Sequence, residues 1–122
     1  MSLSLVTLNL HGYLVAEGMA RFVGEYNRVL TGGQYDGLEV IHGKGHGAPS
    51  GLRDALREIL RAEGTRIKGF DAKLALRGAT YLFEGPGKLA YMYGEDAMNN
   101  AGCTVVVPKA RIYLPPEWRR YR

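Results

Sequence analysis

The chain begins with an alternating apolar run that is followed by a longer stretch of helical periodicity, and this order then repeats. In residues 5–10 every second position is apolar, which predicts a strand with Thr7, Asn9 and His11 on its other face. Residues 15–30 have helical spacing, and consecutive glycines shortly afterwards predict the end of this helix. The positions predicted to face the core are Val15, Met19, Phe22, Val23, Tyr26 and Leu30.

A second strand is predicted at residues 38–42 and a second helix at residues 50–62. Leu38, Val40 and His42 share one face of this strand. The strand–helix–strand order predicts that the two strands are parallel and joined by a right-handed crossover. Their carboxyl ends then share one edge of the sheet, where ligands bind in open α/β sheets. The apolar stripe of the second helix comprises Leu52, Ala55, Leu56, Ile59 and Leu60.

Shorter β-like segments separated by glycine-bearing turns follow, and they complete a predicted α/β fold in one domain of 122 residues. Beyond them, residues 115–122 have the character of an extended basic tail. The predicted segments are residues 66–70, 79–83, 88–93, 103–107 and 111–114.

All three histidines lie in two short motifs, residues 8–12 and 42–47, each at the predicted end of a strand. His11 and His42 are therefore expected near the same sheet edge. Because imidazole titrates near neutral pH, two of them can supply one base and one acid, as phosphodiester cleavage requires. His46 is a third candidate, although a histidine in a loop is more often only solvated. Each histidine taken alone more often holds a loop by a hydrogen bond.

The second motif is a glycine-rich loop that leads into the second predicted helix. Gly43, Gly45 and Gly47 allow the backbone to approach an anion closely, and the first N–H groups of a helix attract phosphate. Lys44 adds a positive charge. The loop lacks the spacing of a Walker A motif, and glycine-rich turns of this kind are commonly no more than tight turns.

The charge and the cysteine content bear on the partner and the compartment. The net charge of +4 favours an anionic partner such as nucleic acid, although many small proteins are equally basic. The single cysteine, Cys103, cannot form an intrachain disulfide, which fits a cytoplasmic location. No apolar run is long enough to cross a bilayer, so no membrane partner is expected.

The two motifs resemble those of Smr (small MutS-related) domains. Residues 8–12, Leu-Asn-Leu-His-Gly, are similar to the family's Leu-Asp-Leu-His-Gly, and residues 42–47 are similar to its His-Gly-x-Gly-x-Gly. The resemblance implies a two-layer α/β sandwich (βαβαββ), like the C-terminal domain of translation initiation factor three, over a core of about residues 5–84. It also implies binding of DNA or RNA and, as in several members, endonuclease activity. Whether a divalent metal such as Mg²⁺ or Mn²⁺ takes part stays open.

Carried onto this chain, the resemblance makes His11, His42 and the position of Asn9 the candidate catalytic site. Asn9 departs from the family pattern, in which this residue is usually an acid. An amide cannot act as a base and is a poorer metal ligand than a carboxylate. A nucleic-acid-binding module that has lost cleavage is therefore the alternative, and a protein-interaction domain is a third. The candidate phosphate-binding residues are Gly12, Gly43, Lys44, Gly45, His46 and Gly47.

Residues 85–122 are expected to form a C-terminal β extension with a basic tail. Basic and aromatic residues alternate there, which would suit a single nucleic-acid strand. The preferred interpretation is that extra strands cover an edge of the sheet. The Gly-Ala-Thr-Val-like strand that ends the family pattern is accordingly assigned to residues 78–81, because an assignment to residues 102–105 requires a large insertion.

Three arginines recur along the second predicted helix, at Arg53, Arg57 and Arg61. Asp54 and Glu58 can pair locally with Arg57 and Arg61, so a solvated helix face is the favoured interpretation.

Overall fold

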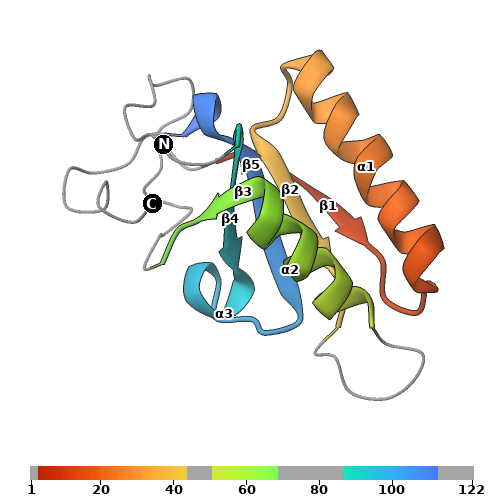
Figure 1. The fold of residues 1–122 in the computed structure, drawn as a ribbon. Coiled ribbons are helices and arrows are strands. Elements are labelled where there is room, and N and C mark those ends of the chain that lie inside the picture. Colours follow the sequence, from red (N-terminus) through yellow and green to blue (C-terminus); the bar gives the residue numbers. More distant parts are fainter. Residues whose placement is uncertain (1–2, 44–50, 69–86, 113–122) are drawn as a thin grey trace.

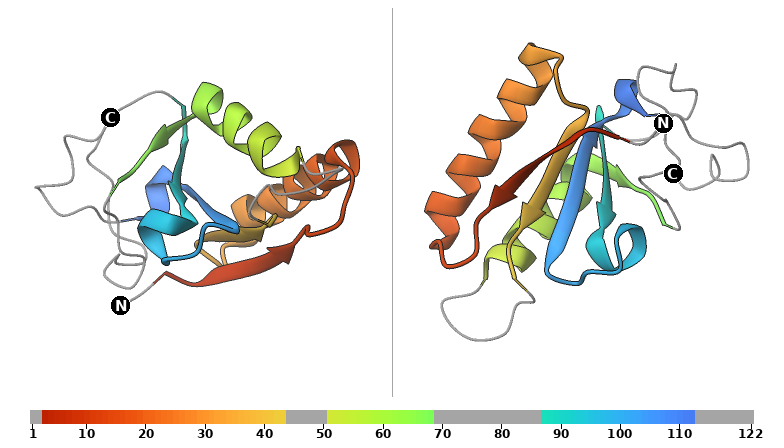
Figure 2. Two further views of the ribbon diagram at one scale, coloured as in Figure 1. Left: turned by 90° about the horizontal axis from the view of Figure 1, so that it is seen from below. Right: turned by 180° about the vertical axis from the view of Figure 1, so that it is seen from behind.

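The computed structural model describes residues 3–43, 51–68 and 87–112. In these ranges, two long helices lie on one face of a five-stranded mixed sheet (Figures 1 and 2). The strand order is β1-β2-β5-β4-β3. The strands are β1 (Leu5–Asn9), β2 (Gly37–Ile41), β3 (Gly64–Arg66), β4 (Leu89–Tyr93) and β5 (Cys103–Pro108), and the helices are α1 (Val15–Gly32), α2 (Leu52–Glu63), α3 (Gly94–Ala97) and a 3₁₀ helix (Lys109–Arg111).

The first strand–helix–strand unit has the predicted form. β1 and β2 are parallel, with Leu5 opposite Gly37 and Asn9 opposite Ile41. α1 ends at the predicted glycines, because Gly33 adopts the left-handed conformation (φ 70°) that caps a helix. The fold class, a mixed α/β domain, is thus the predicted one at this level.

The buried face of α1 is narrower than its apolar stripe. Val23 and Leu30 are 53% and 45% exposed, so their predicted core positions are wrong. Helix α2 packs closely against α1 at Gly18, where a Cβ atom would come within 2.7 Å of the Leu52 side chain. The part of the apolar stripe that carries Val23 and Leu30 faces solvent instead. The buried residues of α1 are Gly18, Phe22 and Val29.

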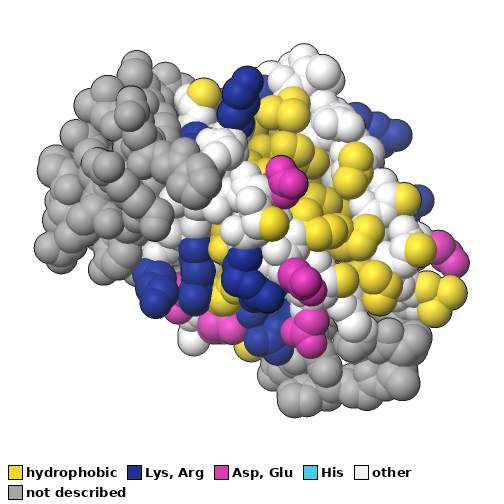
Figure 3. Space-filling view, in the orientation of Figure 1, with side chains coloured by type: hydrophobic (Ala, Val, Ile, Leu, Met, Phe, Trp, Pro, Cys, Tyr) yellow, Lys and Arg dark blue, Asp and Glu magenta, His cyan; other side chains and the backbone are white. Residues whose placement is uncertain are grey.

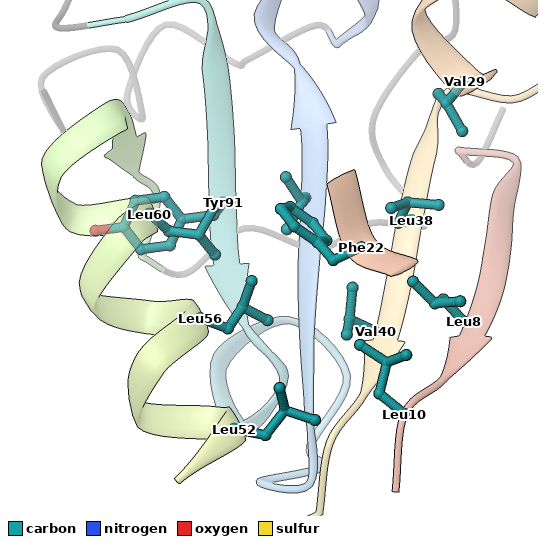
Figure 4. Close-up of a cluster of buried hydrophobic side chains, with 11 residues drawn as sticks. Leu8, Leu10, Phe22, Val29, Leu38, Val40, Leu52, Leu56, Leu60 and Tyr91 are labelled. Carbon is teal, nitrogen blue, oxygen red and sulfur yellow. The ribbon is translucent and has the colours of Figure 1, made fainter. Parts of the chain in front are cut away.

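The main core lies between the two helices and the sheet (Figure 4). α2 contributes one row of leucines to it, whereas Ile59, also predicted to be buried, is 44% exposed. Burial of a leucine side chain stabilises the fold by roughly 1.5–3 kcal/mol, so this row fixes α2 firmly on the sheet. The core residues are Leu8, Leu10, Phe22, Val29, Leu38, Val40, Leu52, Leu56, Leu60, Tyr91 and Val106.

The late strands occupy the middle of the sheet, and this corrects the expected extension at an edge. β5 is antiparallel to β2 on one side and to β4 on the other. Val106 packs with the main core, whereas Val105 and Val107 belong to a second buried cluster. Because every residue of β5 is buried, the strand is suited to the centre of a sheet and not to an edge.

Two other predicted strands have a different outcome. Arg111, expected to start a strand, lies in the 3₁₀ helix. The predicted strand at 79–83 falls outside the described residues, as does the preferred alignment at residues 78–81.

Among the helices that the structure describes, none combines the length and the apolar character needed to cross a membrane.

Candidate functional site

The carboxyl ends of β1, β2 and β4 lie at one edge of the sheet, because these three strands run in the same direction (Figure 1). At the end of β1, the side-chain oxygen of Asn9 accepts a hydrogen bond from the backbone N–H of His11 (3.0 Å). Gly12 follows with φ 90°, a conformation that favours glycine. Asn9 therefore builds the turn that presents His11, whose side chain is exposed.

The two sequence motifs meet where His11 lies against Gly43. A Cβ atom at Gly43 would come within 2.8 Å of His11 Cδ2, and the φ of Gly43 is +84°. The positive φ favours glycine at this position, and a side chain there would displace the imidazole of His11. The backbone N–H groups of His42 and Gly43 donate to the carbonyl of Gly102 (both 3.0 Å), so the residue just before β5 holds the end of β2 in place. Residues 42 and 43, the described part of the second motif, thus lie beside the end of the first motif.

The two imidazoles nevertheless have different environments, since the His42 side chain is only 3% exposed. Its Nδ1 lies 2.6 Å from the carbonyl oxygen of Gly43 and its Nε2 lies 2.7 Å from Thr104 Oγ1. A carbonyl only accepts, so Nδ1 carries the proton and Nε2 accepts from the threonine hydroxyl. Both ring nitrogens are thus engaged by the protein.

Burial lowers the pKa of His42, and the nearby positive charges of Arg57 and Arg53 lower it further. The hydrogen bond to Gly43 and the charge of Glu95 act in the opposite direction. His42 is therefore a neutral group at physiological pH, which fits a residue that holds the end of β2.

Thr104 connects His42 to Arg57, a residue that is 4% exposed. Arg57 Nε donates to Thr104 Oγ1 (3.0 Å), and Arg57 Nη2 donates to the carbonyl of Cys103 (3.0 Å). Its guanidinium also forms a paired contact with the Glu95 carboxylate, at 3.2 and 2.8 Å. The prediction that Arg57 lies on a solvated face is therefore wrong, and its partners are distant residues instead of Asp54.

The guanidinium of Arg57 also lies on the ring of Tyr93, with Cζ 3.8 Å from the ring centroid. Arg66 lies over the same ring at the same distance. Arg53 is 3.7 Å from Glu95, and Arg61 donates to the Tyr93 hydroxyl (3.4 Å). Figure 3 shows Lys and Arg side chains gathered over this part of the molecule, with acidic side chains beside them.

Sequence reasoning missed this arginine cluster, because the three-residue spacing from each acid to the next arginine suggested local pairs. The partners of Arg57, which are Glu95, Cys103 and Thr104, lie 38 to 47 residues away, and no local pattern indicates them. The alternative alignment at residues 102–105 would have indicated this part of the molecule. That segment includes the start of β5 and contains Gly102 and Thr104, which bond to the end of β2 and to His42.

The other predicted site residues, Lys44, Gly45, His46 and Gly47, lie in the part of the chain that the structure does not describe. At the described edge, Asn9 Oδ1 and both ring nitrogens of His42 are engaged with protein groups. Within the described ranges there is also no group of three His, Cys, Asp or Glu residues placed to hold a metal ion.

Comparison with known proteins gives no assignment: no protein-family model, no curated protein and no solved structure matches the chain.

Proposed function

We propose that this domain binds the sugar–phosphate backbone of a nucleic acid at the edge formed by the carboxyl ends of β1 and β2. The observation that carries the proposal is the contact between His11 and Gly43, which joins an exposed imidazole to two glycine turns with positive φ. The backbone N–H groups of His11, His42 and Gly43 already donate within the protein. The group offered to a phosphate at this edge is therefore the exposed imidazole of His11, which can donate a hydrogen bond. The net charge of +4 acts in the same direction.

Binding is proposed ahead of cleavage because of how His42 is held. Both of its ring nitrogens are engaged, and burial lowers its pKa, so it does not offer a proton to a ligand at this edge. Asn9 uses its side-chain oxygen to shape the turn. The resemblance to Smr domains supports nucleic acid as the ligand and rests on the two motifs alone.

Endonuclease activity is the second candidate, and the exposed side chain of His11 is the observation that favours it. An imidazole at this position would transfer one proton, either from the attacking water or to the leaving sugar oxygen. A nicking assay on supercoiled plasmid, with and without Mg²⁺ or Mn²⁺, tests this candidate. His11→Ala should abolish cutting, and equal rates for the variant and the wild-type protein would exclude His11 as the catalytic group.

Binding is tested by fluorescence anisotropy with labelled DNA and RNA duplexes of about 20 base pairs at several salt concentrations. Gly43→Ala should weaken binding about tenfold, because a side chain both strains a positive φ and displaces His11. The matched control is Gly24→Ala: Gly24 is helical and a Cβ atom there meets nothing within 4 Å. The absence of salt-sensitive binding to either duplex would refute the proposal.

A further inference from the structure

Resting on the proposed nucleic-acid binding, we propose that Arg61 and Arg66 form a second contact site for the sugar–phosphate backbone. Neither residue belongs to the two sequence motifs. Arg61 lies in the last turn of α2 and Arg66 ends β3, and both approach the ring of Tyr93 at the carboxyl end of β4. Tyr93 therefore gathers guanidinium groups from two elements beside the β1–β2 edge.

The arginines around Tyr93 divide into an anchor and two accessible groups. Arg57 is the anchor, because it is 4% exposed and holds Thr104, Cys103 and Glu95. Arg61 is exposed, and the side chain of Arg66 is 33% exposed. A guanidinium that stacks on an aromatic ring keeps a fixed plane, and its N–H edge then matches a phosphate in a paired geometry.

The atoms of Arg66 limit how a phosphate can approach it. Its Nε is closed to solvent, and its Nη2 donates to Asp96 (2.9 Å). A phosphate would therefore meet the exposed part of the guanidinium and share or replace the contact with Asp96.

The acidic side chains around the arginines determine whether the cluster attracts a phosphate at long range or only by direct contact. Asp96 pairs with Arg66 at 2.9 Å, and Asp54 and Glu58 are exposed on the first and second turns of α2. These charges offset the field of the arginines at long range, so binding must come from direct contact with the guanidinium groups. Asp96 then competes with the phosphate for Arg66, and its removal should strengthen binding.

The test is the salt dependence of binding to the same DNA and RNA duplexes, between about 50 and 400 mM salt. Arg61→Gln and Arg66→Gln should each reduce the slope of log K against log[salt] by about 0.9, which is a loss of about eightfold at 0.1 M salt. Asp96→Asn should strengthen binding several-fold. The control is Arg28→Gln, on a residue of α1 whose side chain is 79% exposed and pairs with Glu25; it should leave the slope unchanged.

The outcomes separate the two proposals. If the wild-type protein binds neither duplex, the proposed function fails and the second contact fails with it. If the wild-type protein binds but Arg61→Gln and Arg66→Gln keep its slope, only the second contact is refuted. Wild-type or weaker affinity in Asp96→Asn would refute the competition at Arg66. Urea unfolding of each variant establishes that it is folded before its binding is compared.

Discussion

Arg57 is the residue whose replacement tests the structure most directly. Arg57→Met keeps much of the side-chain volume and removes the guanidinium. The carbonyl of Cys103 loses a buried partner, while Thr104 keeps its hydrogen bond to His42. A buried hydrogen bond to a charged group contributes about 1.5–3 kcal/mol, and the contact with Tyr93 adds about 0.5–1 kcal/mol.

The pair with Glu95 adds little to this sum, because the Glu95 side chain is 37% exposed and water screens the interaction. The expected loss in the free energy of unfolding is therefore about 2–4 kcal/mol for Arg57→Met. For Glu95→Gln the expected loss is less than about 1 kcal/mol. Since small domains are stable by only about 5–15 kcal/mol, the first loss is large.

Urea unfolding followed by far-UV circular dichroism measures both values, provided that the slope of free energy against urea is unchanged. Arg61→Met is the matched control, because it makes the same replacement on an exposed residue one turn further along α2. A loss of less than about 0.5 kcal/mol for Arg57→Met would refute the reasoning, since that is the range of ordinary surface substitutions. An equal or larger loss for Glu95→Gln would also contradict it.

Three other variants test separate parts of the structure. Burial lowers the pKa of His42, so this residue binds a proton more readily in the unfolded chain than in the folded protein. The free energy of unfolding should therefore fall as the pH drops below about 6.5. His42→Gln should flatten this dependence in urea unfolding between about pH 7.5 and 5. The guanidinium of Arg111 caps α1 by donating to the carbonyls of Val29 and Leu30 (2.6 and 2.9 Å). Arg111→Ala should therefore lower the free energy of unfolding in urea by about 1–3 kcal/mol and leave nucleic-acid binding intact. An unchanged unfolding midpoint would contradict this role. Gly43→Ala should cost about 1–2 kcal/mol through strain at a positive φ, and a stability equal to that of the wild-type protein would show that the turn adapts.

The first half of the sheet could be predicted because its information is local. Alternation in residues 5–10 and 38–42 gives two strands, and the connection through a helix makes them parallel. The same alternation also separates the two histidines. His42 shares its face with Val40, which is buried, whereas His11 follows the face of Asn9, which is exposed. The alternation therefore indicated that His42 is buried. The prediction of one site with two imidazoles considered only that both strands end at the same edge.

The second half could not be predicted, because strand pairing over long distances leaves no local signal. An alternating or apolar run indicates a strand but not its neighbours, so β5 appeared to be an addition when it is the centre of the sheet. The wrong prediction for Arg57 follows from the wrong placement of β5, since its partners Thr104 and Cys103 belong to that strand. Had the pairing been known, a buried arginine beside them would have been a reasonable expectation.

The position of β5 has a consequence for how the protein is made. In the described sheet β5 lies between β2 and β4, and the pairing of Ile41 with Cys103 brings together residues 62 positions apart. On the ribosome, the first strand–helix–strand unit emerges long before the strand that covers its inner edge. Until residue 108 has left the exit tunnel, β2 keeps one row of backbone groups unpaired, which is a surface prone to wrong association. Nascent chains of this protein should therefore depend on rapid completion of synthesis, or on a chaperone, more than a chain with only local pairing would.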